Sequence, residues 1–266
     1  MLIATDLDGT FLRPDATVSA RNLAALEAAE AAGVHVVPVT GRAIGGLRHI
    51  GPIFHRYALV CNGAVGLDLS GDDVLHTLPI PPETVRGFVE TMTAHLPGVL
   101  FCSAVDDSSI FAVEAGYDEL TPPYEAENDP AEHVVVTREE LCSRGALKLM
   151  VTHPSVPARE VFALAERLAI PGVHTTWAGF SMAEANRADV NKAAGLEQIC
   201  KVLGEDRSDV VALGDGANDV EMLRWAGTSY AMANANPLAI EAADRRAPSC
   251  DEDGFAIVVE ELLASR

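Results

Sequence analysis

The chain has 266 residues, and its 39 acidic and 19 basic side chains give it a formal net charge of −20. The length fits two modest domains, each with its own core, and the negative charge disfavours nucleic acid and anionic membranes as partners. No apolar run approaches the roughly 20 residues that a membrane span needs, and no secretion signal is recognisable. The five cysteines are scattered and form no CxxC pair. This pattern argues against a disulfide framework or a zinc site and predicts a cytoplasmic protein.

The first strand is predicted at Leu2–Thr5, a short apolar run that stops abruptly at Asp6. Asp6 and Asp8 are two residues apart, so extended backbone points both carboxylates to the same side. Two carboxylates this close repel each other unless a cation lies between them or one holds a proton. Gly9 allows the backbone to turn and to approach a ligand closely. Asp, Gly and Thr are also ordinary turn residues, so this stretch has a purely structural interpretation as well.

Two further strands in the N-terminal part also end in small polar residues. The strand at 34–39 is followed by Thr40 and Gly41 and then by a helical stretch, an arrangement in which unpaired backbone donors face an anion. Thr and Gly at a strand end are usually structural, so this pair alone decides little. The strand at 58–61 is closed by Asn62. The alternation of strands and helices predicts an α/β fold with a doubly wound parallel sheet.

The pattern changes at the proline cluster 79–82, which interrupts any continuing element and predicts a linker. Beyond it, two stretches with apolar residues at helical spacing accompany several strand-like runs. These runs lie at 99–103, 110–114, 147–152 and 173–177. Strands clustered around two helices predict an α+β domain with an antiparallel sheet, inserted at 83–185. The core domain then consists of 1–82 together with 186–266.

The parallel pattern resumes with a helix that carries Lys192 in its first turn. A helical lysine is nearly always a solvated surface group. The next strand, at 210–213, runs directly into a glycine-flanked acid, Asp215. Asn218 and Asp219 follow where a helix begins, and helix capping alone explains Asn218 and, in part, Asp219. Capping does not explain Asp215.

Four strand ends, taken in order, resemble the motifs of the haloacid dehalogenase superfamily of phosphohydrolases. The matching stretches are DLDGT at 6–10, Thr40, Lys192 and GDGAND at 214–219, a specific combination. The position of the insert resembles that of the Cof-type subfamily, which has a large α+β cap. NGA at 62–64, AMANA at 231–235 and DEDGFA at 251–256 also resemble that subfamily. The chain departs from the subfamily pattern at Asp189, Ala193 and Ala233, where relatives have glycine.

The resemblance implies a nucleophile, an acid and base, and a metal. It makes Asp6 the nucleophile that takes the phosphoryl group as an acyl phosphate. It makes the Asp8 side chain the general acid for the leaving oxygen and later the base for water. It also implies Mg²⁺, held by the carboxylates of Asp6 and Asp215 and by the backbone carbonyl of Asp8.

The resemblance also implies residues around the phosphate. Thr40 and Lys192 would hold its oxygens while charge moves during transfer. Gly41, Asn62 and Asn218 are the further candidates for binding phosphate. Asn218 and Asp219 would also orient the metal, its waters and Lys192 without binding the metal themselves.

The sequence therefore predicts a Mg²⁺-dependent phosphohydrolase for small phosphorylated metabolites, above all sugar phosphates. A phosphomannomutase-like phosphotransferase is the first alternative, and it would need a bisphosphate activator. A non-catalytic regulator that binds a metabolite or Mg²⁺ is the second, and it predicts a missing motif, yet none is missing. The absence of membrane segments excludes a transport ATPase.

The inserted domain is expected to recognise the leaving group of the substrate. Its aromatic candidates are Tyr117, Tyr124, His174 and Trp177, although aromatic side chains in a small α+β domain more often belong to the core. The sequence selects neither one substrate nor an oligomeric state.

Overall fold

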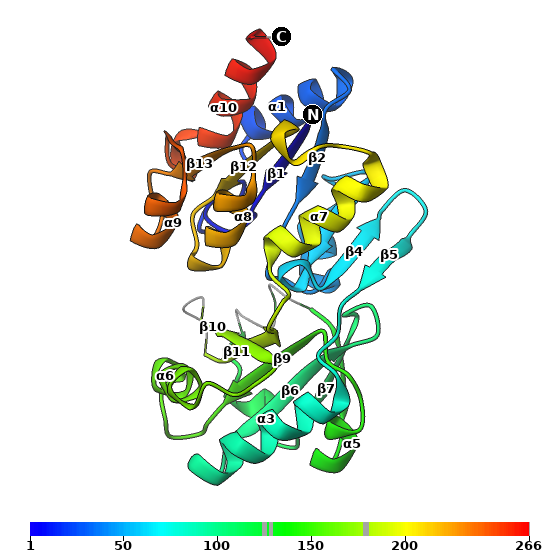
Figure 1. Ribbon diagram of the computed structural model, residues 1–266, viewed down its shortest axis with the longest axis vertical. Helices are drawn as coiled ribbons and strands as arrows, with labels where there is room; N and C mark the ends of the chain where they lie inside the picture. Colours follow the sequence, from blue (N-terminus) through cyan, green and yellow to red (C-terminus); the bar gives the residue numbers. More distant parts are fainter. Residues whose placement is uncertain (124–126, 128–129, 178–180, 266) are drawn as a thin grey trace. The chain divides into compact units, whose positions relative to one another are not determined.

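The computed structural model describes residues 1–123, 127, 130–177 and 181–265, and the chain separates into two compact units (Figure 1). Unit 1 comprises Met1–Gly41, Ile50–His76 and Asn191–Arg266, and unit 2 comprises Arg42–His49 and Thr77–Val190. The domain division predicted above, with a core of 1–82 and 186–266 and an insert of 83–185, stays a proposal. Within the described ranges, none of the helices combines the length and the apolar character that a membrane span requires.

The sheet of unit 1 has five parallel strands in the order β14-β13-β12-β1-β2. These strands are β1 (Leu2–Thr5), β2 (His35–Pro38), β12 (Val210–Gly214), β13 (Thr228–Met232) and β14 (Arg245–Ala247). Thr5 at the end of β1 lies in register with Pro38 on one side and Leu213 on the other. The carboxyl ends of β12, β1 and β2 therefore lie at one level. The predicted α/β fold with a parallel sheet is confirmed, whereas β13 and β14 were not predicted.

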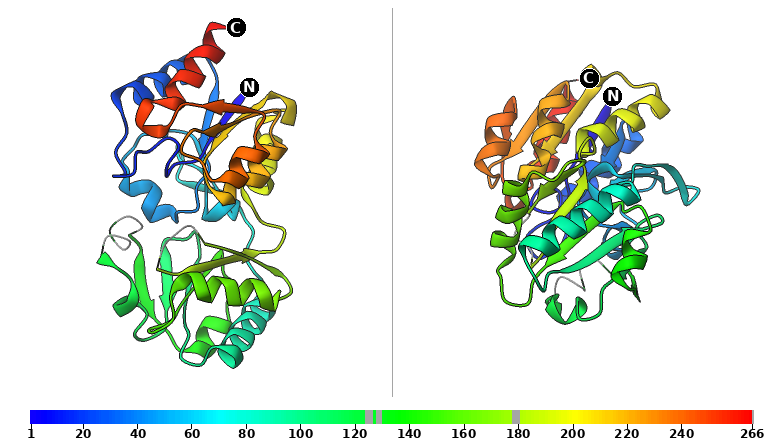
Figure 2. Two further views of the ribbon diagram at one scale, coloured as in Figure 1. Left: turned by 90° about the vertical axis from the view of Figure 1, so that its left-hand side faces the viewer. Right: turned by 60° about the horizontal axis from the view of Figure 1, so that its bottom comes forward.

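Helices cover both faces of this sheet (Figure 1). They are α1 (Ala20–Ala31), α7 (Lys192–Leu203), α8 (Val220–Trp225), α9 (Pro237–Ala242) and α10 (Gly254–Ala264). Helices α1 and α10 lie side by side on one face, as the left view of Figure 2 also shows. On the other face, Ala4 and Val37 of the sheet belong to one buried cluster with Ile199 of α7 and Met222 of α8. Burying apolar side chains on both faces is what a parallel sheet requires.

The third predicted strand takes a different place from the one expected. Strand β3 (Tyr57–Val60) pairs antiparallel with β4 (Val65–Asp68), and β5 (Asp73–Thr77) completes a separate three-stranded sheet. A parallel bridge between Val39 and Leu59 joins it to the segment just after β2, and the N–H of Thr40 donates to the carbonyl oxygen of Leu59 at 2.9 Å. The reason for this different place is the tight turn that follows β3, in which Cys61, Asn62 and Gly63 all have positive φ. This turn reverses the chain at once, where a parallel connection would need a longer crossover.

Unit 2 has a six-stranded sheet in the order β10-β11-β9-β6-β7-β8. Its strands are β6 (Leu100–Val105), β7 (Ile110–Val113), β8 (Glu132–Val135), β9 (Lys148–Thr152), β10 (Val173–Thr176) and β11 (Ala183–Arg187). All neighbours are antiparallel except β7 and β8. The predicted antiparallel sheet is present, whereas β8 and β11 were not predicted.

The described helices of unit 2 are α2 (Ile44–His49), α3 (Pro82–His95), α5 (Arg138–Cys142) and α6 (Ala158–Leu168). Helices α3, α5 and α6 pack on the six-stranded sheet. Phe88 of α3, Phe101 of β6 and Val161 of α6 belong to one buried cluster. The proline cluster 79–82, expected to be a linker, ends in the first residue of α3. Proline suits that position because the first helical residue needs no N–H partner.

A close contact between two glycines generates the first prediction. A methyl group on Gly195 of α7 would lie 2.7 Å from the Cα atom of Gly63. Because backbone cannot give way cheaply, we expect Gly195→Ala to lower the free energy of unfolding by about 1–3 kcal/mol. Gly87→Ala in α3 is the matched control, since nothing lies within 4 Å of its new methyl group, and it should stabilise by about 0.5–1 kcal/mol. Urea unfolding followed by circular dichroism measures both, and an unchanged Gly195→Ala protein would contradict the packing.

Candidate active site

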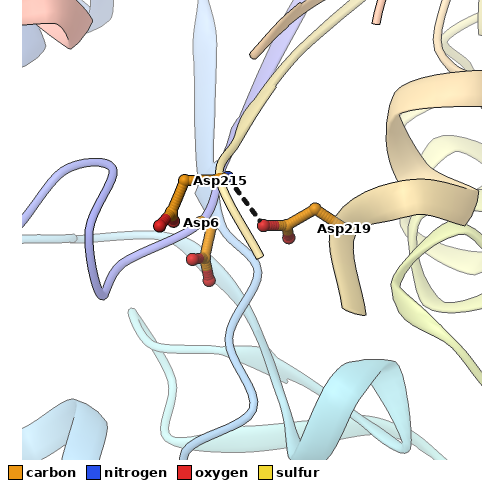
Figure 3. A group of neighbouring side chains, drawn as sticks. All are labelled: Asp6, Asp215 and Asp219. Atoms are coloured by element: carbon orange, nitrogen blue, oxygen red, sulfur yellow. Dashed lines mark hydrogen bonds between the residues drawn. The ribbon is translucent and has the colours of Figure 1, made fainter. Parts of the chain in front are cut away.

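Three carboxylates converge at the carboxyl ends of β1 and β12 (Figure 3). Asp6, Asp215 and Asp219 bring carboxylate oxygens within 4.8 Å of one another. Asp6 directly follows β1 and Asp215 directly follows β12, and these are adjacent parallel strands. Asp219 belongs to the short turn before α8 and points toward the other two (Figure 3). Ligand sites of open parallel sheets lie at this edge, beyond the carboxyl ends of the strands.

Lys192 lies inside this acidic group. It is the first residue of α7 and is fully buried. Its Nζ donates to Oδ1 of Asp6 and to Oδ1 of Asp219, both at 2.6 Å. Burial opposes the charge of the ammonium group, but the attraction of Asp219 and Asp6 outweighs it and raises the pKa of Lys192. Lys192 is therefore not solvated, unlike most lysines on helices.

Asp219 joins the ammonium group to the backbone of the neighbouring loop. Its Oδ2 accepts the N–H groups of Asp215 at 2.9 Å and of Gly216 at 2.8 Å, while its Oδ1 accepts Lys192. The side chain is completely buried. Gly214 leaves the space that it needs, because a methyl group on Gly214 would lie 2.7 Å from the Asp219 Cβ. Asp219 thus caps the turn, as its position in the sequence indicates, and also holds the lysine.

Asp215 is oriented by neutral donors. Thr10 Oγ1 donates to its Oδ1 at 2.9 Å, and Asn234 Nδ2 donates to its Oδ2 at 3.4 Å. The backbone N–H of Asn236 donates to its carbonyl oxygen at 2.8 Å. Neither Thr10 nor Asn234 was predicted to have a role in the site. Both stand inside stretches that resemble family motifs, and this was the only signal that could have found them.

The charge of the group favours a divalent cation. When all are ionised, three carboxylates against one ammonium leave two negative charges uncompensated. Burial and the charge of Asp219 raise the pKa of Asp6 well above its usual range, and the same two causes raise the pKa of Asp215 to about 6. Oxygen ligands are what Mg²⁺ prefers in proteins. The donor set therefore fits Mg²⁺.

The residues expected around the phosphate form a second group beside the acids. Thr40 is buried, and its carbonyl oxygen accepts the N–H of Asn62 at 2.9 Å. The side chain of Asn62 accepts from Nδ2 of Asn218 at 3.0 Å. Gly41 lies against this pair, since a methyl group on it would lie 3.2 Å from Asn62 Oδ1 and 3.7 Å from Asn218 Nδ2. The structure thus brings Thr40, Gly41, Asn62 and Asn218 together, although they come from three segments.

Asp8 lies apart from the three converging carboxylates. Its side chain is exposed and does not belong to that group, whereas Asp219 does. The role expected of Asp8 in metal binding uses its backbone carbonyl, and that role stays a prediction. Asp189, one of the departures from the family pattern, is largely exposed and pairs with Arg187 at 2.6 Å. Ala193, another departure, is buried in α7 beside Lys192.

The aromatic candidates of unit 2 divide between core and surface. Tyr117 is buried, which fits a core position. Trp177 stacks on Phe162 of α6 with ring centroids 6.5 Å apart. His174 is exposed on β10. Tyr124 lies outside the described residues.

A family model described as haloacid dehalogenase-like hydrolase matches residues 3–259. The chain belongs to this family. The family predicted from the four motifs is therefore confirmed, and the chain is a hydrolase.

The relatives of the chain include curated phosphatases, that is, phosphoric monoester hydrolases. It is 31% identical to the 5-amino-6-(5-phospho-D-ribitylamino)uracil phosphatase YbjI of Escherichia coli, over 98% of this chain and 96% of the relative. It is 28% identical to the pyridoxal phosphate phosphatase YbhA of the same species, over 88% of each. Among solved structures, the sugar phosphatase BT4131 of subclass IIB has a TM-score of 0.81 at 22% identity, with 98% of each chain covered. This last likeness shows the fold.

The buried lysine generates the second prediction. We expect Lys192→Met to lower the free energy of unfolding of the metal-free protein at pH 8 by about 3–5 kcal/mol, because Asp6 and Asp219 then lose a buried partner. Lys201→Met on the same helix is the control, since Lys201 is exposed and pairs only with Glu197 at 3.1 Å among the ion pairs of the described residues. That change should stay within about 0.5 kcal/mol. Chemical unfolding measures both, and equal effects of the two substitutions would refute a structural role for the buried pair.

Proposed function

We propose that this chain is a Mg²⁺-dependent phosphohydrolase that removes phosphate from small phosphorylated metabolites, above all sugar phosphates, through an aspartyl phosphate on Asp6. The observation that carries the proposal is the convergence of Asp6, Asp215 and Asp219 at the carboxyl ends of β1 and β12, with the buried Lys192 bonded to Asp6 and Asp219. The substrates in the names of the two curated relatives support the substrate class, because both are small phosphate esters. The five cysteines are free and buried, which supports a reducing compartment, and we assign the protein to the cytoplasm.

Asp6 is the proposed nucleophile, and its two carboxylate oxygens have different surroundings. Lys192 binds Oδ1 at 2.6 Å, so we assign the attack on phosphorus to Oδ2. The new bond from Oδ2 to phosphorus forms as the bond from phosphorus to the leaving oxygen breaks, and Asp8 gives its proton to that oxygen. Asp8 then takes a proton from water, which attacks the phosphorus of the acyl phosphate. This second step releases inorganic phosphate and restores the Asp6 carboxylate.

The remaining residues hold the phosphate and the charges around it. Thr40, Gly41, Asn62 and Asn218 form a largely neutral group beside the acids that would bind phosphate oxygens. Lys192 would keep Asp6 ionised and oppose the negative charge that collects during transfer. Bound Mg²⁺ would supply the positive charge that lets an anionic substrate approach these acids, and Asp6, Asp215 and the carbonyl of Asp8 would hold it. On a chain with a net charge of −20, such a local cation is needed for an anionic substrate.

Metal removal and an isosteric substitution test the proposed function. With a panel of phosphorylated metabolites we expect release of inorganic phosphate that a chelator abolishes and Mg²⁺ restores. Asp6→Asn should fold like the wild type and lose activity, because an amide cannot form the acyl phosphate. Phosphate release and circular dichroism measure these effects, and mass spectrometry excludes deamidation of the variant. Full activity of the chelated enzyme would reject the metal role, and turnover by intact Asp6→Asn would reject the nucleophile.

Asp8→Asn tests the acid and base separately from the nucleophile. It keeps the backbone carbonyl, so fold and metal affinity should change little, but it removes a proton donor that typically contributes about 10² to 10⁴ in rate. A sugar alkoxide needs that proton, whereas p-nitrophenolate leaves without it. Formation of the aspartyl phosphate should therefore slow far more with a sugar phosphate than with p-nitrophenyl phosphate.

The breakdown of the intermediate lacks its base with either substrate. With p-nitrophenyl phosphate, Asp8→Asn should therefore release about one nitrophenolate per site in a burst and then turn over slowly. Rapid-quench kinetics measure the burst, and hydroxylamine releases the trapped phosphate from the protein. Equal slowing of both substrates, without a burst or trapped phosphate, would show that Asp8 has another role.

A further inference from the structure

Asn234 joins three segments of unit 1 through one side chain. Its Nδ2 donates to the carbonyl oxygen of Gly9 at 2.8 Å and to Oδ2 of Asp215 at 3.4 Å. Its Oδ1 accepts the backbone N–H of Cys250 at 3.0 Å. Gly9 belongs to the loop after β1, Asp215 to the loop after β12 and Cys250 to the turn before α10. Both the nitrogen and the oxygen of the Asn234 amide therefore form hydrogen bonds, at a point where loops far apart in the sequence meet.

The two loops that Asn234 joins touch at Gly9. A methyl group on Gly9 would lie 2.9 Å from Cγ of Asp215, and Gly9 has a φ of 81°. The carboxylate of Asp215 thus rests directly against the backbone of the other loop. Contact alone does not fix its rotation, however. Thr10 Oγ1 fixes one oxygen, at 2.9 Å, and the amide of Asn234 fixes the other.

The chemical nature of the donor matters as well. A lysine or arginine at this place would neutralise Asp215 and compete with a cation for its oxygens. The amide of Asn234 carries no charge, so it orients the carboxylate and leaves its negative charge available. This combination suits a residue that supports a metal ligand without binding the metal.

We propose that Asn234 is a positioning residue that, anchored on the Gly9 carbonyl, holds the Asp215 carboxylate in the orientation that binds Mg²⁺. It acts through Asp215 and does not touch the substrate. The inference rests on the proposed function, because it assigns Asp215 to the metal. It assigns a role to the AMANA stretch, to which the resemblance to the family gave none.

The main test is Asn234→Ala, with Mg²⁺ as the probe. We expect the Mg²⁺ dissociation constant of the metal-free protein, measured by calorimetry, to rise about 10-fold to 100-fold. In kinetic assays the Mg²⁺ concentration for half-maximal activity should rise in parallel. At saturating Mg²⁺, KM for the phosphate ester should stay close to the wild-type value, since Asn234 does not contact the substrate.

Two control variants separate positioning from a general loosening of the loops. Asn236→Ala removes the side chain that caps α9 by accepting the N–H of Leu238 at 2.9 Å, while its backbone bond to Asp215 remains. It should lower the melting temperature and leave the Mg²⁺ affinity unchanged. Cys250→Pro removes the N–H that Asn234 accepts and exchanges the buried Cys250 side chain for a proline ring, at the first residue of a helical turn where proline fits. It too should leave the Mg²⁺ affinity unchanged.

The possible outcomes are distinct. A weaker Mg²⁺ affinity in Asn234→Ala alone supports the inference. An unchanged affinity with a lower melting temperature would reduce Asn234 to a structural link between loops and overturn it, as would an equal loss of affinity in either control. A wild-type protein that binds no Mg²⁺ and keeps its activity in chelator would overturn both this inference and the metal role in the proposed function. An unchanged Asn234→Ala beside a Mg²⁺-binding wild type would overturn the inference alone.

Discussion

The structure of the site depends on one buried ammonium group. Lys192 has no exposure to water and lies 2.6 Å from an oxygen of Asp6 and 2.6 Å from an oxygen of Asp219. Each of these charges would be strongly unfavourable in its buried place without the others. The lysine stands at the start of α7, one acid follows β1 and the other precedes α8. A single electrostatic arrangement therefore fixes the relative positions of a strand end and two helix ends.

The register of the sheet supplies the frame for this arrangement. Because Thr5, Pro38 and Leu213 lie side by side, the residues that follow β1, β2 and β12 leave the sheet at the same level. Acids follow two of these strands, and Thr40 lies just beyond the third. The donors that orient the acids from the loops are mostly neutral, namely hydroxyl, amide and backbone N–H groups. Such donors set direction while they leave the site its attraction for a cation.

Strands and acids could be predicted wherever an apolar run stops at a charged residue, as at Asp6 and Asp215. Other elements leave no such pattern. The three residues of β14 include Arg245 and Arg246, and they form a strand because β13 offers them backbone partners. Strand β11 has a polar sequence, and its Glu184 can be buried because it pairs with Lys148 of β9, at 2.8 Å. A pairing partner supplied by another segment cannot be recognised from the local sequence.

The same limit applies to the site. The spacing of the motifs predicted the acids and Lys192 as site residues. That the Lys192 side chain is buried depends on packing, which the motifs do not describe. Thr10 and Asn234 make their bonds to Asp215 across 205 and 19 residues, and no periodic pattern encodes such contacts. The third strand was predicted to run through Cys61 and to close at Asn62, but the chain already turns at Cys61, whose positive φ is unusual for that residue type.

The interruption of unit 1 by unit 2 has a consequence for biosynthesis. Most of unit 2 is one continuous stretch, Thr77–Val190, whereas the strands of unit 1 lie on both sides of it. On the ribosome, β1 and β2 emerge first, and β12 follows only after the whole of that stretch. During this interval β1 has an unpaired edge and Asp6 lacks its lysine. Because domains generally fold as units while the chain is being made, we expect unit 2 to complete its core before unit 1, and the group of Asp6, Lys192, Asp215 and Asp219 can assemble only after β12 and the turn that follows it have emerged.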